Sequence, residues 1–167
     1  ASCLVGSEMC IRDSNITHYI YAPKEDSYIR QKWRIEDKSL EARSIPKNIA
    51  QVYTLSPGAD FNRKSKKDFN LLLSKFNFAI DKGFSEVGLL FDDIDINNIG
   101  IESDDKDLGK FHGELISEII TKLGLSNGWF CPSIYCESFS KKGIQNDKYL
   151  QGLSLIHISE PTRQEAI

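Results

Sequence analysis

The sequence predicts an α/β fold in which parallel strands alternate with helices, and three observations lead to this prediction. Residues 87–91 form a nearly continuous apolar run, as is typical of a parallel strand that is buried on both faces. Other short runs rich in β-branched and aromatic residues occur before and after it. Segments with apolar residues at helical spacing separate these runs. Right-handed crossovers between successive strands would make the whole sheet parallel.

The first strand is expected over residues 18–22, a β-branched and aromatic run that Pro23 stops. A charged loop at residues 24–26 follows, and the polar stretch around Trp33 is expected to be helical. Residues 48–55 predict the second strand, which ends in a Ser-Pro-Gly turn.

Two amphipathic helices are expected on either side of the central apolar run. The first covers residues 67–82, and Gly83 stands just beyond it, where a left-handed cap is favoured. The second follows a polar loop at residues 97–107 and closes near Gly124. The apolar positions that predict these helices are Phe69, Leu72, Leu73, Phe76 and Ile80 in the first and Phe111, Leu115, Ile119 and Ile120 in the second. Residues 129–136 then predict a fourth strand and its loop.

The two ends of the chain differ from its middle. Residues 153–163 resemble the translation of a sequencing-library adapter, and residues 4–13 resemble the translation of its complementary strand. Segments of this kind are set aside before the fold is considered. We therefore expect residues 1–14 and 153–167 to be adapter-derived and residues 15–152 to be the folded domain.

Charge and composition exclude some classes of partner. The chain has a net charge of −3, and its ends hold four acids and two bases, which leaves −1 for the middle. A nucleic-acid-binding protein would present a basic face, so no nucleic acid is expected. No apolar run is long enough to span a membrane, and no membrane association is expected. Cys131 and Cys136 are a poor disulfide or metal signature, and we expect two small buried hydrophobic side chains, which leaves the compartment undetermined.

An acidic cluster follows the central strand at Asp92, Asp93 and Asp95. The simplest interpretation of the cluster is a solvated turn. A second interpretation is a calcium-binding loop, although Asn98 stands at the position where such a loop needs glycine. The third is a catalytic pair, because the carboxyl ends of strands carry the chemistry of α/β folds and adjacent carboxylates can differ in pKa. Neighbours on a strand face opposite ways, so Asp92 and Asp93 could serve one substrate only if the strand end bends.

Four segments together resemble the successive strand-end motifs of glycoside hydrolase family 84, the β-N-acetylglucosaminidases. They are YIYAPKED at residues 19–26, LSPG at 55–58, LLFDDID at 89–95 and FCPSIYC at 130–136. The resemblance covers nearly all of residues 18–150. It departs from the family at Ser133-Ile134-Tyr135, where Thr-Glu-Tyr is usual, and in a short segment between Trp33 and Ala50.

The resemblance implies a partial (β/α)8 TIM barrel, with about four central strand–helix units of the catalytic domain in residues 15–152. It further implies a retaining hydrolase that removes terminal GlcNAc from a glycoprotein or glycan, with no metal and no cofactor. The acetamido group of the sugar would attack the anomeric carbon in place of an enzyme nucleophile. The first strand and the sixth to eighth strands would lie outside the chain, so the fragment alone is expected to be inactive.

The resemblance also implies roles for individual residues. Asp92 matches the carboxylate that orients the acetamido N–H, and Asp93 matches the general acid and base. Lys24 matches a contact to a sugar hydroxyl, Tyr135 a phenol near the acetamido group, and Cys131 a residue that lines the acetamido pocket.

The alternative is a non-catalytic carbohydrate- or metal-binding barrel relic whose acidic cluster is structural. Asp95 is expected to be structural under either hypothesis, as a cap for the following loop. His112 lies beside Phe111 on a predicted helix, where packing is expected rather than catalysis. His18 has no neighbouring residues at metal-ligand spacing and is assigned no function.

Overall fold

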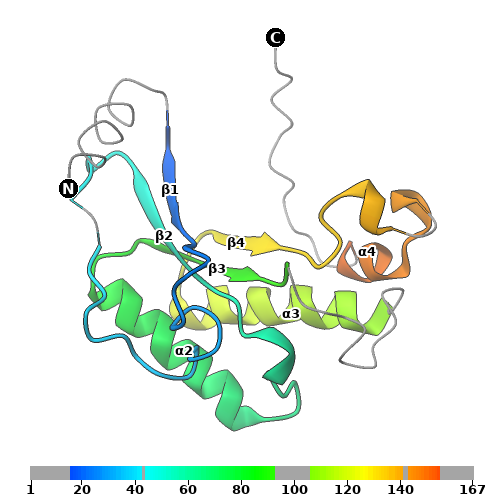
Figure 1. Cartoon of the computed structure of the whole chain (residues 1–167), viewed down its shortest axis with the longest axis horizontal. Coiled ribbons are helices and arrows are strands. Elements are labelled where there is room, and N and C mark those ends of the chain that lie inside the picture. Colours follow the sequence, from blue (N-terminus) through cyan, green and yellow to red (C-terminus); the bar gives the residue numbers. More distant parts are fainter. Residues whose placement is uncertain (1–15, 43, 93–105, 141–142, 155–167) are drawn as a thin grey trace.

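Four parallel strands, hydrogen-bonded in their sequence order, form the sheet on which the chain is built (Figure 1). The computed structural model describes residues 16–42, 44–92, 106–140 and 143–154. The strands are β1 (His18–Tyr21), β2 (Ala50–Leu55), β3 (Glu86–Leu90) and β4 (Gly128–Cys131). All four strands, and their parallel arrangement, are confirmed.

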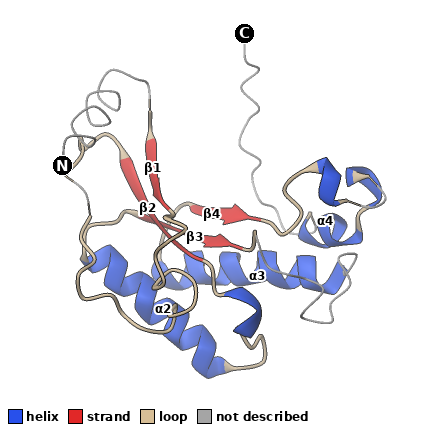
Figure 2. Ribbon diagram, viewed as in Figure 1, coloured by secondary structure: helices blue, strands red, loops and turns tan. Residues whose placement is uncertain are grey.

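Two long helices, α2 (Lys66–Asp81) and α3 (Lys106–Leu123), follow β2 and β3 and pack against the same face of the sheet (Figure 2). Both were predicted within a few residues of their observed bounds. Ser65 caps the start of α2 by accepting from the backbone N–H of Asp68 at 3.2 Å. Gly83 has φ 104° just beyond α2, as predicted, and Gly124 has φ 66° just beyond α3.

A short helix, α4 (Lys148–Leu153), was not predicted. Asp147 caps its start, accepting from the backbone N–H of Leu150 at 3.1 Å. The 3-10 turns are η1 (Gly58–Asp60), η3 (Glu137–Phe139) and η4 (Ile144–Asn146). Among the described helices, none combines the length and the apolar character needed to cross a membrane.

The core lies between the sheet and the two long helices. Alternate strand residues supply the sheet side of this core, as the two-residue period of a strand requires. Its fully or nearly fully buried members are Tyr53, Leu55, Val87 and Leu89 from the strands, Leu72, Phe76 and Ala79 from α2, and Leu115, Ile116 and Ile119 from α3. Full burial of one such side chain contributes about 1.5–3 kcal/mol, so this layer fixes the sheet on its helices.

The other face of the sheet carries Thr54, Gly88 and Trp129 side by side in register. A Cβ at position 88 would lie 3.0 Å from the Cβ of Trp129 and 3.1 Å from Cγ2 of Thr54. Close packing of Thr54 and Trp129 across β3 therefore favours glycine at this position.

The prediction of a helix around Trp33 is wrong, because residues 27–34 form successive turns instead. The cause is tertiary. Trp33 is fully buried, and the ammonium of Lys75 on α2 donates to the carbonyls of Tyr28, Lys32 and Ile35. Two of these bonds measure 2.5 and 2.7 Å, to Tyr28 and Ile35. These tertiary contacts hold the segment in its turns, and the carbonyl of Lys32 also accepts from the backbone N–H of Ile35 at 2.8 Å.

Candidate active site

The described candidate residues all follow the carboxyl ends of strands, which share one edge because the sheet is parallel. Lys24 follows β1, Asp92 follows β3, and Cys131 ends β4 with Tyr135 shortly beyond it. Asp93 and Asp95 lie outside the described residues. The polar loop predicted at residues 97–107 also lies mostly outside them.

The backbone just before Asp92 is hydrogen-bonded to Cys131 across the β3–β4 pair. Leu90 is in register with Cys131, and the N–H of Phe91 donates to the carbonyl of Cys131 at 2.9 Å. The ladder therefore extends one residue beyond β3 and holds the backbone immediately before Asp92. Asp92 itself is half-buried.

One carboxylate oxygen of Asp92, Oδ1, is buried and has no hydrogen-bond partner among the described residues. A buried carboxylate oxygen without a donor is energetically costly, so such a group is rarely left in a fold for structural reasons alone. It can accept one hydrogen bond from a donor brought to this edge of the sheet.

Lys24 and Tyr135 are more exposed than Asp92. Lys24 lies in a solvent-exposed turn beyond β1. The ring of Tyr135 is 49% exposed and packs edge-on against Phe139, with 5.0 Å between ring centroids. The structure thus places both at the same edge of the sheet as Asp92.

Cys131 is half-buried and Cys136 is exposed, and both are thiols rather than disulfide partners. The prediction of two buried hydrophobic cysteines is therefore wrong for Cys136. Its sulfur lies 3.0 Å from Oγ of Ser138. No group of three or more metal-ligating side chains occurs within the described ranges.

The loop that bears Lys24 is closed by Asp26. The hydroxyl of Tyr21, the last residue of β1, donates to Oδ2 of Asp26 at 3.0 Å, and the N–H of Tyr28 donates to Oδ1 at 2.8 Å. Burial, followed by this carboxylate, raises the pKa of Tyr21 to about 12, so its hydroxyl keeps its proton. Asp26 thus joins the end of β1 to the turns that follow.

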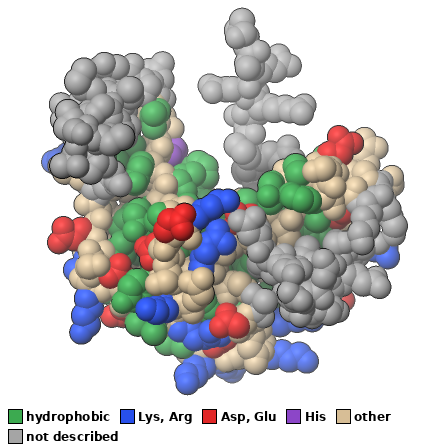
Figure 3. Space-filling view, in the orientation of Figure 1, with side chains coloured by type: hydrophobic (Ala, Val, Ile, Leu, Met, Phe, Trp, Pro, Cys, Tyr) green, Lys and Arg blue, Asp and Glu red, His purple; other side chains and the backbone are tan. Residues whose placement is uncertain are grey.

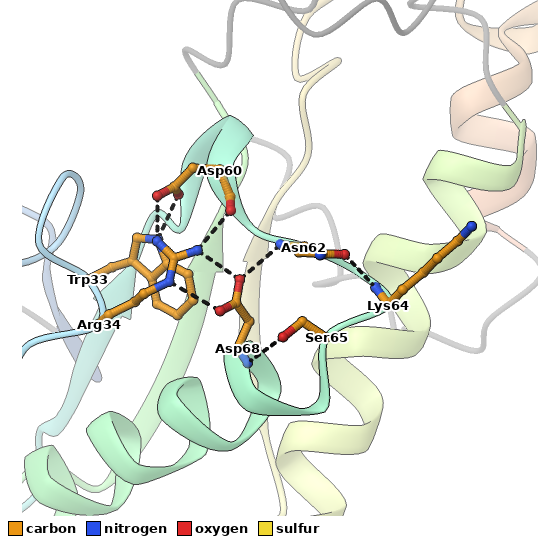
Figure 4. Close-up of polar contacts among 7 residues, drawn as sticks. All are labelled: Trp33, Arg34, Asp60, Asn62, Lys64, Ser65 and Asp68. Atoms are coloured by element: carbon orange, nitrogen blue, oxygen red, sulfur yellow. Dashed lines mark hydrogen bonds and ion pairs between the residues drawn. The ribbon is translucent and has the colours of Figure 1, made fainter.

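Arg34 ties these turns to the loop after β2 (Figure 4). Its guanidinium donates to both carboxylate oxygens of Asp68, at 3.2 and 2.7 Å, and to the carboxylate and carbonyl of Asp60. Asp60 also accepts from the indole N–H of Trp33 at 2.9 Å. The hydrogen bonds from Arg34 lower the pKa of Asp68 below its usual value, so this carboxylate stays ionised.

The amino-acid sequence does not reveal this network, which joins the turns after β1 to the segment after β2 and to the start of α2. Arg34 and Asp68 lie on different elements and far apart in sequence, and no local motif marks them as partners. The capping residue Ser65 ahead of α2 was the nearest available signal.

His112 has the packing role expected for it. It is 5% exposed and stacks on Phe91 with 3.7 Å between ring centroids and 6° between planes. Its Nδ1 lies 3.0 Å from the hydroxyl of Tyr149 on α4. Burial lowers the pKa of His112 to about 3, so the imidazole is neutral near pH 7. His18, in contrast, lies 3.7 Å from Glu86 and packs edge-on against Trp129.

Figure 3 shows Lys and Arg side chains interspersed with Asp and Glu side chains over the described part of the face in view. This pattern agrees with the small net charge of the chain.

Comparison with known proteins places the chain beside one group of enzymes. The model of the β-N-acetylglucosaminidase family matches residues 9–154. The protein O-GlcNAcases of Rattus norvegicus and Mus musculus are each 30% identical to the chain over 145 residues, which is 80% of the chain and 16% of each relative. The chain therefore spans about a sixth of the length of these curated relatives.

Among solved structures, a mutant of the Thermobaculum terrenum O-GlcNAc hydrolase superposes with a TM-score of 0.67 at 20% identity. The superposition covers 90% of this chain and 34% of that one. At this identity the likeness concerns the fold alone. It agrees with four parallel strands as part of a TIM barrel, which confirms the predicted partial barrel.

Proposed function

The chain belongs to the β-N-acetylglucosaminidase family, glycoside hydrolase family 84, and from this premise we propose that the protein containing it removes O-linked GlcNAc from glycoproteins or glycans. The family match covers residues 9–154 and so includes every candidate residue. No metal and no cofactor take part in the proposed reaction.

The proposed mechanism uses the acetamido group of the substrate. Its carbonyl oxygen attacks the anomeric carbon while the bond to the leaving oxygen breaks and Asp93 transfers a proton to that oxygen. The resulting oxazoline-like intermediate is opened by water, which gives up a proton to Asp93. Two displacements at one carbon give net retention. An enzyme carboxylate attacks directly in the commoner retaining scheme.

Asp92 is proposed to accept a hydrogen bond from the acetamido N–H and to stabilise the positive charge that develops on this group. The single observation that most supports this role is the buried Oδ1 of Asp92, which has no partner among the described residues. A carboxylate held at the end of a hydrogen-bonded ladder is preorganised to receive such a donor. Cys131 would line the acetamido pocket, Tyr135 would contact the acetamido group, and Lys24 would contact a sugar hydroxyl.

We expect the 167-residue chain alone to be inactive. Four parallel strands are described, and a sugar in a (β/α)8 barrel is held by loops from strands all around the barrel. Contacts to the remaining sugar hydroxyls would come from strands beyond these four.

The experiment is a stereochemical assay of a protein that carries this segment. With 4-nitrophenyl N-acetyl-β-glucosaminide as substrate, NMR should show the β anomer of GlcNAc as the first product. The N-trifluoroacetyl analogue should react more slowly, because fluorine withdraws electrons from the attacking carbonyl oxygen. The matched β-glucoside, which lacks the acetamido group, should not be hydrolysed.

First formation of the α anomer, or equal rates with and without the acetamido group, would contradict the mechanism. Binding of GlcNAc without turnover would instead favour a non-catalytic carbohydrate-binding barrel.

A further inference from the structure

Tyr149 of α4 connects the loop after β4 to helix α3. Its hydroxyl accepts from the backbone N–H of Ser133 at 3.2 Å and lies 3.0 Å from Nδ1 of His112. Tyr149 is 1% exposed, and its side chain lies in a cluster with Leu108 and Ile134. Ser133 and Ile134 directly precede Tyr135, so two consecutive residues anchor the backbone that carries this candidate phenol.

We assign the directions of these hydrogen bonds from the donors and acceptors that each group offers. Because the hydroxyl of Tyr149 already accepts from Ser133, its own hydrogen is satisfied when it donates to Nδ1 of His112. His112 is then the tautomer with its proton on Nε2. Burial lowers the pKa of His112 to about 3 and raises that of Tyr149 to about 12, so neither group titrates near neutral pH.

The ring face of His112 packs against the end of β3, next to Asp92. The imidazole is stacked on Phe91, the residue immediately before Asp92, and Phe91 also packs against Phe130 of β4. One neutral histidine thus contacts the β3 end through its ring and, through Nδ1, the Tyr149 hydroxyl that accepts from the β4 loop.

Helix α4 is held against α3 too closely to shift freely. A Cβ on Gly109 would lie 1.9 Å from the carbonyl oxygen of Tyr149, and a Cβ on Gly152 would lie 2.0 Å from that of Lys106. The two glycines let the backbones of α3 and α4 come into contact, and this contact fixes the position of Tyr149 along the axis of α3.

We propose that His112 and Tyr149 are positioning residues, which hold the loop bearing Tyr135 at a fixed place relative to the strand end bearing Asp92. The inference rests on the proposed function, since it assigns Tyr135 and Asp92 to one acetamido group. Neither His112 nor Tyr149 touches the substrate. They act through the Ser133 amide and the Phe91 ring.

The test measures turnover of 4-nitrophenyl N-acetyl-β-glucosaminide by a protein that carries the full chain. Tyr149→Phe should lower kcat by about tenfold to a hundredfold, as is typical of a small misplacement remote from the chemistry, and should change KM less. The double variant with Tyr135→Phe should be no slower than Tyr135→Phe alone, because both changes remove the same contact.

A pair of variants at His112 separates the hydrogen bond from the packing. His112→Asn keeps an acceptor near the position of Nδ1 but loses the ring stacked on Phe91, and it should also lower kcat. His112→Phe keeps a ring against Phe91 but removes the acceptor, and it should match Tyr149→Phe. Ile119→Val, a buried change elsewhere on α3, controls for general loss of stability, and it should leave kcat unchanged.

An active parent whose Tyr149→Phe variant keeps its kcat would overturn the inference and leave the proposed function intact. So would additive losses in the double variant, or an unchanged kcat in both His112 variants. If Tyr149→Phe fails to fold, the two His112 variants decide the matter. A parent protein that does not hydrolyse the substrate would overturn the proposed function first, and with it this inference.

Discussion

At the scale of the residue, the two adjacent acids after β3 are proposed to divide one reaction between them. Asp93→Asn should remove proton transfer to the leaving oxygen. In a protein that carries the chain, the loss should therefore be largest for substrates with poor leaving groups, at about a hundred- to ten-thousandfold, and small for activated aryl glycosides. Kinetics over a series of aryl leaving groups measures this dependence.

The matched variant is Asp92→Asn, which should slow every substrate in the series to a similar extent. Orientation of the acetamido group and stabilisation of its charge are needed whatever group departs. Equal dependence of the two variants on the leaving group would show that the roles of Asp92 and Asp93 are wrongly divided.

His112 should make the stability of the chain depend on pH. Its pKa is about 3 in the folded state and about 6.5 when unfolded, so the unfolded state binds more protons below pH 6.5 and stability falls as pH falls through this window. Between about pH 7 and pH 5 this group should reduce the free energy of unfolding by about 2 kcal/mol.

Urea unfolding of the wild type and of His112→Phe at both pH values checks this prediction. The difference in stability between the two proteins isolates His112, because the other titrating groups are shared. A difference that does not change with pH would contradict a neutral, buried imidazole.

At the scale of the element, the turns after β1 and the start of α2 are joined by Arg34. Arg34→Met removes the bonds to Asp60 and Asp68 and leaves the buried carboxylate of Asp68 without its main donors. We expect a loss of about 1–2 kcal/mol in the free energy of unfolding. Denaturant titration of the variant against the wild type gives the measurement.

Lys110→Met is the control for this element. Lys110 forms an exposed pair with Glu114 at 3.6 Å, one turn apart on α3, and such pairs contribute about 0.3–0.5 kcal/mol. Equal losses in the two variants would mean that Arg34 acts as an ordinary surface charge and does not hold the two loops together.

At the scale of the whole molecule, the adapter interpretation of the two ends predicts that they contribute little to stability. Removal of residues 1–14 and 155–167 should change the free energy of unfolding by only a few tenths of a kcal/mol, as for neutral surface changes. Leu153 and Ser154 are retained because they complete α4, where the N–H of Ser154 donates to the carbonyl of Leu150 at 2.9 Å. Thermal unfolding of the trimmed and untrimmed chains compares them directly, and a large loss on trimming would refute the interpretation.

The sequence by itself determined the strands, the two long helices and the edge of the sheet at which the candidate residues lie. Each of these depends on local patterns. The apolar run before Asp92 marks a strand buried on both faces, and a helical spacing of apolar residues marks the faces of α2 and α3 that pack on it. Glycines after those helices marked their ends, because left-handed backbone conformations favour glycine.

Only the tertiary structure decided what joins these elements. The segment around Trp33 forms turns, and Lys75, 40 or more residues away along the chain, holds them by donating to three of their carbonyls. Tyr149 and His112 are 37 residues apart, and Arg34 and Asp68 are 34 residues apart. Hydrogen bonds between such distant residues depend on how the elements pack in space. The local periodicity of apolar residues does not predict that packing.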